Sequence, residues 1–210
     1  MQSAAVFGDS GNVRPSWRAR STTDSGSESE LASAIAQARR GNENAFRVLY
    51  RSVQPALLRY LRVLVGQDAE DVASEAWLQI ARDLPAFRGD ADGFRGWATT
   101  VARNRAMDHL RGQQRRPVQA GQIEELAERP GPGDTAASAV DSLATDAALA
   151  MIAKLPRDQA EAVLLRVVVG LDAKAAGKVL GKRPGAVRTS AHRGLRALAE
   201  LLEKGPDQAV

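Results

Sequence analysis

The sequence contains no cysteine and only two histidines, His109 and His192, among its 210 residues. The absence of cysteine excludes disulfides, thiolate metal ligands and cysteine nucleophiles. Because the two histidines lie far apart in sequence, a histidine-rich metal site is not expected either. Aromatic residues make up only 4% of the chain, but an apolar content of 44% suffices for compact cores. We therefore expect no metal and no cofactor.

Long apolar runs and targeting signals are also missing. No apolar stretch is long enough to span a bilayer, so membrane insertion is not expected. Residues 1–30 lack the charged-then-apolar order of a secretory signal. The sequence has no glycine-rich phosphate loop, no clustered carboxylates and no His/Ser/Asp grouping. We expect a cytoplasmic protein that is not an enzyme.

Positive charge gathers in two clusters. The net charge of +4 and the pI of about 9.8 favour a polyanionic partner only weakly. One cluster, with Asp108 as its only acid, comprises Arg103, Arg105, Arg111, Arg115 and Arg116. The other contains no acid and comprises Lys182, Arg183, Arg188, Arg193 and Arg196. A solvated helix face would explain either cluster alone, but two clusters on helices with apolar backs favour a nucleic acid.

The spacing of apolar residues predicts an all-α protein of two small helical domains joined by a flexible linker. Residues 1–28 are rich in small polar residues without a hydrophobic period, so they should be disordered. The first domain is expected over 29–116 and the second over 141–204. The proline- and glycine-rich segment 117–140 should be the linker, and 205–210 a short tail.

In the first domain, an apolar stripe over 46–64 predicts a helix that Gly66 should end. Pro55 should kink or split this helix, because it lacks an N–H and clashes with the preceding turn. Asp68 is expected to cap a second helix, which stops before Pro85.

A loop is expected over residues 87–93, because glycine and aspartate are frequent there. A third helix should follow from about Phe94 to Arg111. Its apolar spacing predicts that it buries Phe94, Ala98, Val101 and Leu110.

Residues 171–195 have the spacing of a DNA-binding helix-turn-helix. Asp172 should cap a short helix, Gly181 should make the turn, and Pro184 should occupy the first position of the next helix. Gly177 should allow the two helices to cross closely. The inward face of the second helix is expected to hold Val187, Ala191 and Leu195.

The outward face of that second helix is basic. Arg183 and Arg188 are the candidates for reading base edges, because arginine pairs well with guanine. Arg193 and Arg196 are expected to hold phosphates. The residues expected to face duplex DNA are Arg183, Arg188, Thr189, His192, Arg193 and Arg196. An ordinary helical hairpin with a basic face is the alternative.

Three segments carry a family resemblance. DAEDVASEAWLQIARDLPAFRGD, followed by GFRGWATTVARNRAMDHLRGQQRR, closely resembles region two of the extracytoplasmic-function (ECF) sigma factors of bacterial RNA polymerase. LPRDQAEAVLLRVVVGLDAKAAGKVLGKRPGAVRTSAHRGLRAL resembles their region four. The resemblance implies a subunit that binds core polymerase and directs promoter recognition, DNA melting and transcription initiation for a stress- or signal-responsive regulon. A stand-alone helix-turn-helix regulator is the alternative, but it leaves the region-two resemblance unexplained.

The resemblance also implies roles by position. The clamp of the largest polymerase subunit would contact Asp68, Glu70, Asp71, Glu75, Gln79 and Arg82. The minus-ten element would be melted and read by Phe87, Arg88, Asp90, Arg95, Arg103, Asn104 and Arg105. Region four would dock on the flap of the second-largest subunit while its helix-turn-helix reads the minus-thirty-five element. An anti-sigma factor is a further implied partner.

Some single positions carry expectations of their own. Trp97, at helical spacing with Val101, is expected in the core rather than as a stacking platform. Asp108 is expected to pair with Arg111 or Arg105 within its helix. Arg183 replaces a serine-type cap found in the family, at a cost of about 1 kcal/mol. The linker acids Glu124, Glu125 and Glu128 would either mimic nascent RNA or belong to a plain tether.

Overall fold

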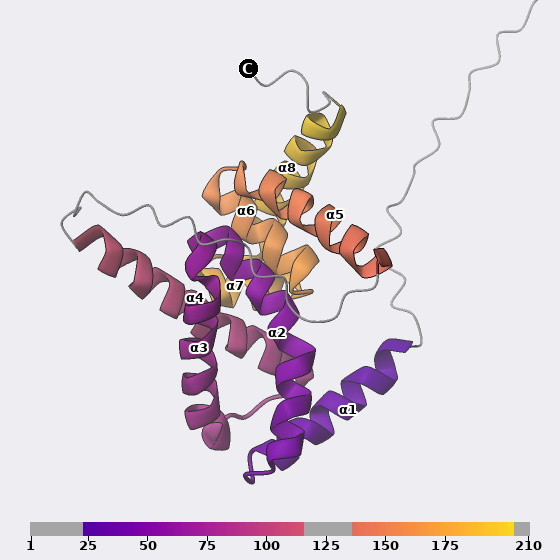
Figure 1. The fold of residues 1–210 in the computed structure, drawn as a ribbon, viewed down its shortest axis with the longest axis vertical. Coiled ribbons are helices and arrows are strands. Elements are labelled where there is room, and N and C mark those ends of the chain that lie inside the picture. Colours follow the sequence, from indigo (N-terminus) through magenta and orange to yellow (C-terminus); the bar gives the residue numbers. More distant parts are fainter. Residues whose placement is uncertain (1–22, 116–135, 204–210) are drawn as a thin grey trace, which may run out of the picture.

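The structure, a computed structural model, describes the backbone of residues 23–115 and 136–203. Every regular element in these two ranges is helical, which confirms the all-α expectation (Figure 1). The linker acids Glu124, Glu125 and Glu128 lie outside the described residues. No helix within the described ranges is both long and apolar enough to cross a membrane.

Four helices form the first group: α1 (Thr23–Ala38), α2 (Glu43–Val65), α3 (Ala69–Asp83) and α4 (Ala91–Arg115). The helix α2 contacts each of the other three and therefore forms the centre of the group. Its buried side includes Leu49, Leu57, Tyr60 and Leu61, all inaccessible to solvent. The helix α1 begins within the segment expected to be disordered.

The helix α2 has the boundaries that its sequence indicates, but Pro55 does not split it. Asn42 caps its start, since the Asn42 side chain accepts a hydrogen bond from the Ala45 N–H at 3.0 Å. Gly66 ends it with a φ of 62°. Pro55 lies inside the helix on its exposed side. Water can therefore reach the carbonyl that loses its helical partner, and the chain stays helical.

Two expectations about the connections were wrong. Asp68 precedes α3 but makes no side-chain cap; its carboxylate lies 2.8 Å from His109 Nε2 and 2.7 Å from Gln113 Nε2, both on α4. The helix α4 begins at Ala91, ahead of the expected start, because the Asp90 carboxylate accepts a hydrogen bond from the Gly93 N–H at 2.7 Å. Leu110, expected in the core, is only partly buried.

The second group contains α5 (Ala136–Ala153), α6 (Arg157–Val163), α7 (Ala173–Leu180) and α8 (Pro184–Glu203). A π-helical turn, Leu164–Val168, continues α6. The helix α6 packs closely on α8: a Cβ added at Gly194 of α8 would lie 2.8 Å from Val163 Cγ2. The helix α5 begins at Ala136, inside the segment expected to be linker.

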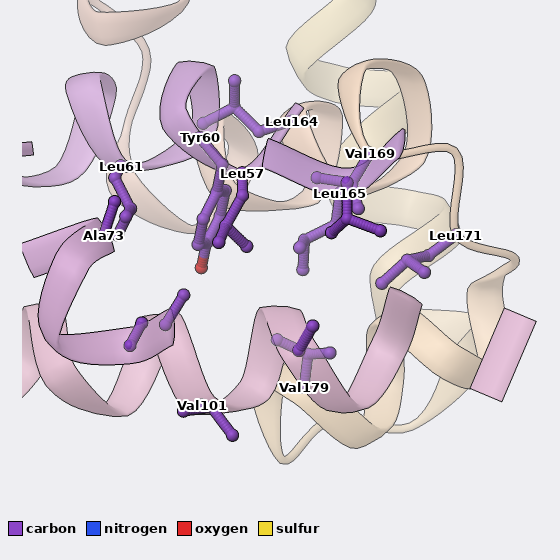
Figure 2. Close-up of a cluster of buried hydrophobic side chains, with 14 of the residues drawn as sticks. Leu57, Tyr60, Leu61, Ala73, Val101, Leu164, Leu165, Val169, Leu171 and Val179 are labelled. Atoms are coloured by element: carbon purple, nitrogen blue, oxygen red, sulfur yellow. The ribbon is translucent and has the colours of Figure 1, made fainter. Parts of the chain in front are cut away.

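The two groups pack against each other. The helix α7 contacts α4, and both α5 and the π-helical turn contact α2. Figure 2 shows this shared core, in which Leu57 and Tyr60 of α2 lie near Leu164 and Leu165 of the π-helical turn. All four side chains are excluded from solvent. The two groups therefore form one continuous apolar core across their boundary.

Candidate nucleic-acid interface

The helix-turn-helix has the local geometry that its sequence predicts. Asp172 caps α7, because its carboxylate accepts a hydrogen bond from the Ala175 N–H at 2.6 Å. Gly181 ends α7 in the left-handed conformation, with a φ of 65°. Pro184 is the first residue of α8. These three predictions are confirmed, and together they set the angle at which α8 leaves α7.

Gly177 lets the turn and the start of α8 approach α7 closely, since a Cβ here would lie 3.6 Å from the backbone nitrogen of Pro184. A Cβ at this position would lie 2.6 Å from the Lys182 carbonyl oxygen, which is far inside van der Waals contact. The Gly177 carbonyl in turn accepts a hydrogen bond from the Lys182 N–H at 2.9 Å. The backbone of the turn thus folds directly over α7, and no side chain fits between them.

The inward face of α8 differs from the prediction at one position. Val187 and Ala191 are buried, whereas Leu195 is 48% exposed. Two steps of four residues rotate a position by about 80° on a helix of 3.6 residues per turn, so Leu195 has left the buried face. Gly194, seven residues after Val187, returns to that face and contacts α6.

The outward face of α8 is open to solvent and rich in unpaired charge. All the residues predicted to face duplex DNA are exposed: Arg183, Arg188, Thr189, His192, Arg193 and Arg196. Arg196 pairs with Glu200 at 3.2 Å. Among the described residues, Arg183, Arg188 and Arg193 have no acidic partner. Three cationic groups are therefore free to bind a polyanion.

Lys182, in the turn, is paired with an acidic residue of the same chain and is not part of this open face. Its ammonium lies 2.6 Å from the Asp158 carboxylate at the start of α6. The hydrogen bond from Lys182, together with its charge, lowers the pKa of Asp158. The pair joins the turn to the start of α6 at the protein surface.

The acidic side of α3 is mostly exposed. Asp71, Glu75 and Arg82 face solvent, and Glu70 makes only a long contact to Arg62 at 3.8 Å. The two remaining candidates lie at the α3–α4 boundary: Asp68 contacts His109 and Gln113 of α4, and Gln79 accepts a hydrogen bond from Arg105 at 2.9 Å.

Leu78 is a surface residue that the sequence patterns did not single out. It is 69% exposed and, at helical spacing, lies between Asp71, Glu75 and Arg82 on the open side of α3. It is a single exposed apolar residue within a charged surface and not a contiguous apolar patch. The available signal was its position outside the Val72–Ala76–Ile80 stripe.

An aromatic cluster lies where the chain enters α4. The half-buried ring of Phe87 is 5.0 Å from Trp97 and 5.6 Å from Phe94, between ring centroids. Phe94 is buried, whereas Trp97 is partly exposed. Trp97 therefore packs against the core, as expected, and still presents part of its ring to solvent.

The polar candidates of α4 and its preceding loop are largely engaged within the protein. Arg88 donates to the Pro85 and Phe87 carbonyls at 2.9 and 2.8 Å. Arg95 pairs with Asp92 at 2.9 Å. Asn104 is exposed, but Arg103 pairs with Glu161 of α6 at 2.7 Å. The structure therefore does not bring Arg103 and Arg105 to one open surface with the other candidates.

Asp108 behaves as one of the two alternatives predicted. It pairs with Arg111 at 2.8 Å within α4, and not with Arg105.

Comparison with known proteins identifies the family. The family model of Sigma-70 region 2 matches residues 49–116, and that of Sigma-70 region 4 matches residues 145–198. The chain is 33% identical to the ECF RNA polymerase sigma factor BldN of Streptomyces coelicolor, over 90% of this chain and 71% of BldN. It is 34% identical to ShbA of Streptomyces griseus, over 83% of this chain and 96% of ShbA. The chain belongs to the ECF sigma factors.

Solved structures show the same fold. CnrH, in complex with the cytosolic domain of CnrY, superposes with a TM-score of 0.58 at 23% identity, covering 83% of this chain and 98% of CnrH. RpoE of Bartonella quintana, in complex with the anti-sigma factor NepR, gives a TM-score of 0.57 at 22% identity, covering 78% of this chain and 98% of RpoE.

As an ECF sigma factor, the chain binds RNA polymerase and recognises promoters. The region 2 match coincides with α2 to α4, and the region 4 match with most of α5 to α8. The helix-turn-helix is thus the region-four element of this sigma factor, which disfavours a stand-alone regulator.

Proposed function

We propose that this sigma factor reads the minus-thirty-five element through the open face of α8. The supporting observation is the set of exposed, unpaired arginines on a recognition helix whose start is fixed by Gly181 and Pro184. The N-terminal residues of such a helix reach base edges in the major groove. Arg183 and Arg188 therefore take the base edges. Phosphates and the groove wall are contacted by Thr189, His192, Arg193 and Arg196.

The minus-ten element is assigned to the start of α4 and the turn before it. Capture of an unstacked base requires a stacking surface and a cationic path for the strand. The partly exposed rings of Phe87 and Trp97 offer the stacking surface. The remaining minus-ten residues in the proposal are Arg88, Asp90, Arg95, Arg103, Asn104 and Arg105.

Core polymerase is assigned to the open side of α3. The clamp of the largest subunit contacts Glu70, Asp71, Glu75 and Arg82, with Leu78 as an apolar contact in the middle. Asp68 and Gln79 act from the α3–α4 boundary. The flap of the second-largest subunit receives region four.

The wider proposal follows family membership. Functional boundaries are 29–116 for region two, 117–140 for the linker and 141–204 for region four. The protein works in the cytoplasm without catalysing a reaction of its own, serves a signal-responsive regulon, and is held in check by an anti-sigma factor.

Transcription by core polymerase on a pool of genomic promoter fragments, with and without this chain, tests the proposal. The chain should add a discrete set of transcripts. Equal transcription in both reactions, under conditions in which a known sigma factor works, would contradict it. Tight promoter binding without polymerase would favour the stand-alone regulator instead.

A further inference from the structure

A third basic surface lies on α2, outside the two clusters that are visible in the sequence. Residues 39–65 contain Glu43 as their only acid. The arginines of this stretch are Arg39, Arg40, Arg47, Arg51, Arg59 and Arg62. They are spread over the whole length of a helix, so they form no dense run of positive charge in the sequence. The winding of α2 is what brings most of them together.

Four of these arginines share the side of α2 that faces away from the core. They are all exposed: Arg47, Arg51, Arg59 and Arg62. Their positions fall within an arc of about 120° on a helix of 3.6 residues per turn. The opposite side of α2 holds the buried residues Leu49, Val53 and Leu57. We call the side with the four arginines the α2 arginine face.

The centre of the α2 arginine face carries uncompensated charge. Arg51 and Arg59 have no acidic partner among the described residues. At one end of the face, Arg47 lies 3.6 Å from Glu43. At the other end, Arg62 makes only long contacts, at 3.8 and 4.0 Å, to one acid of α3 and one of α5. Exposed ion pairs of this kind are weak, so a stronger anion can displace them.

The α2 arginine face offers charge but no apolar anchor. The centre of a protein–protein interface is apolar and poor in charge, whereas a surface that binds nucleic acid is polar and strongly positive. Tyr50, the large apolar residue that α2 exposes, packs its ring against Trp77 of α3 at a centroid distance of 4.9 Å. Ser52 and Pro55 are the exposed residues between the central arginines. The face therefore suits a phosphate backbone better than a protein surface.

The dimensions of the face suit duplex DNA. The helix axis advances by about 22 Å from Arg47 to Arg62. This length corresponds to about six base pairs at roughly 3.4 Å per base pair. The helix α4 packs with the buried side of α2 in the apolar core. DNA on the α2 arginine face is therefore a different segment from the strand assigned to α4.

We propose that the α2 arginine face binds the sugar–phosphate backbone of duplex DNA without reading its bases. This function goes beyond the proposed promoter contacts, because neither promoter element is assigned to α2. Arg51 and Arg59 hold phosphates, and Arg47 and Arg62 exchange their weak acidic partners for further ones. Such a contact adds affinity that depends on salt concentration and not on DNA sequence.

Binding to a random-sequence duplex without promoter elements tests the proposal. The full chain carries Arg183→Gln, Arg188→Gln and Arg193→Gln, so that α8 contributes little, and no polymerase is present. Affinity is measured over a range of salt concentrations. Arg51→Gln should reduce the slope of log affinity against log salt by about 0.9, because one phosphate contact is lost, and Arg59→Gln by the same amount again. If this chain does not bind the duplex at low salt, the proposal is wrong.

Lys154→Gln is the charge-matched control for Arg51→Gln. Lys154 is exposed in the connection between α5 and α6 and has no acidic partner in the described part of the chain. Its substitution should leave the salt slope unchanged. Equal slopes for the two variants would overturn the proposal. An unchanged DNA slope with weaker core-polymerase binding in Arg51→Gln would assign the face to a protein and would overturn it as well.

A DNA-cleaving iron chelate on a single cysteine locates the DNA, because the natural chain has no cysteine. Ser52 is exposed on α2, and Ser74 is exposed on α3. In the same background, a chelate on Ser52→Cys should cleave the random duplex several-fold more than one on Ser74→Cys. Adding Arg51→Gln and Arg59→Gln should remove this excess. Equal cleavage from the two positions would overturn the placement on α2. Neither promoter nor polymerase is present, so a failure of the proposed promoter function is recognised separately, as an absence of added transcripts.

Discussion

The two basic surfaces of this sigma factor, on α8 and on α4, differ in the interaction partners of their arginines. On α8, Arg183, Arg188 and Arg193 are exposed and have no acidic partner among the described residues. On α4, Arg103 and Arg105 are held by Glu161 and Gln79. A similar charge content thus produces one surface whose arginines lack acidic partners among the described residues and one whose arginines are engaged within the protein. Composition alone could not distinguish these two states.

The largest expected effect is on the turn that positions α8 and its exposed arginines. Gly177→Ala should destabilise the protein by about 2–3 kcal/mol, because the added methyl meets the Lys182 carbonyl at 2.6 Å and the turn must move. Chemical denaturation measures the change. Gly185→Ala is the control, since nothing lies within 4 Å of its added Cβ. Equal stabilities of the two variants would show that the turn is not tightly packed.

The next effect concerns base reading on α8. Arg188→Ala should weaken binding of an upstream duplex by about 1–3 kcal/mol and relax specificity at one base pair. Affinity for core polymerase, measured separately, should be unchanged, because Arg188 lies far along the chain from α3. A parallel loss of core affinity would count against this division of labour.

A smaller effect should appear when the ion pair between the two helical groups is broken. Glu161→Ala should destabilise the protein by about 1 kcal/mol, because Arg103 loses its carboxylate partner but stays partly exposed to water. Chemical denaturation measures the change, with Asp108→Ala as the matched control, since that exposed pair lies within α4. Equal stabilities of the two variants would mean that the pair between the groups adds nothing.

The smallest effect is a loss of stability through Tyr60 that occurs only at alkaline pH. Burial raises the pKa of Tyr60 in the folded state. Its contribution to stability is therefore complete below the unfolded value of about 10 and is lost as the pH rises beyond it, by up to about 1.4 kcal/mol per pH unit. The stability difference between the natural chain and Tyr60→Phe should shrink accordingly. A constant difference from pH 9 to 11 would contradict this burial of the phenol.

Interactions between residues close together in the sequence could be predicted from it, whereas contacts between distant residues could not. Asp172, Gly181 and Pro184 act on residues within a few positions of themselves, so their roles in the helix-turn-helix were correctly predicted. Asp68 looked like a cap for the same local reason, but its partners His109 and Gln113 lie on another helix. No local pattern reports such a contact.

Two further differences have geometric causes. Leu195 was placed inward by counting in fours, although the helical repeat is 3.6 residues and the error accumulates with distance. The pairing of Arg103 with Glu161 joins positions 58 residues apart, and a single sequence offers no means of matching one arginine among many to one acid. The resemblance indicated the role of each surface, whereas only the folded chain shows which surface is occupied.

The π-helical turn Leu164–Val168 makes the contact between the two helical groups sensitive to the deletion of a single residue. Its wider winding is closed by the Val169 N–H and the Leu164 carbonyl at 2.9 Å, and both Leu164 and Leu165 are buried in the shared core. Such turns arise from one extra residue within an α-helix. Deleting a single residue here would restore α-helical winding and rotate the downstream part of region four by about 100° relative to α6. The contact between the two helical groups therefore depends on the number of residues in this turn as much as on their identity. An in-frame deletion of one apolar residue would disrupt the contact without removing any charged residue.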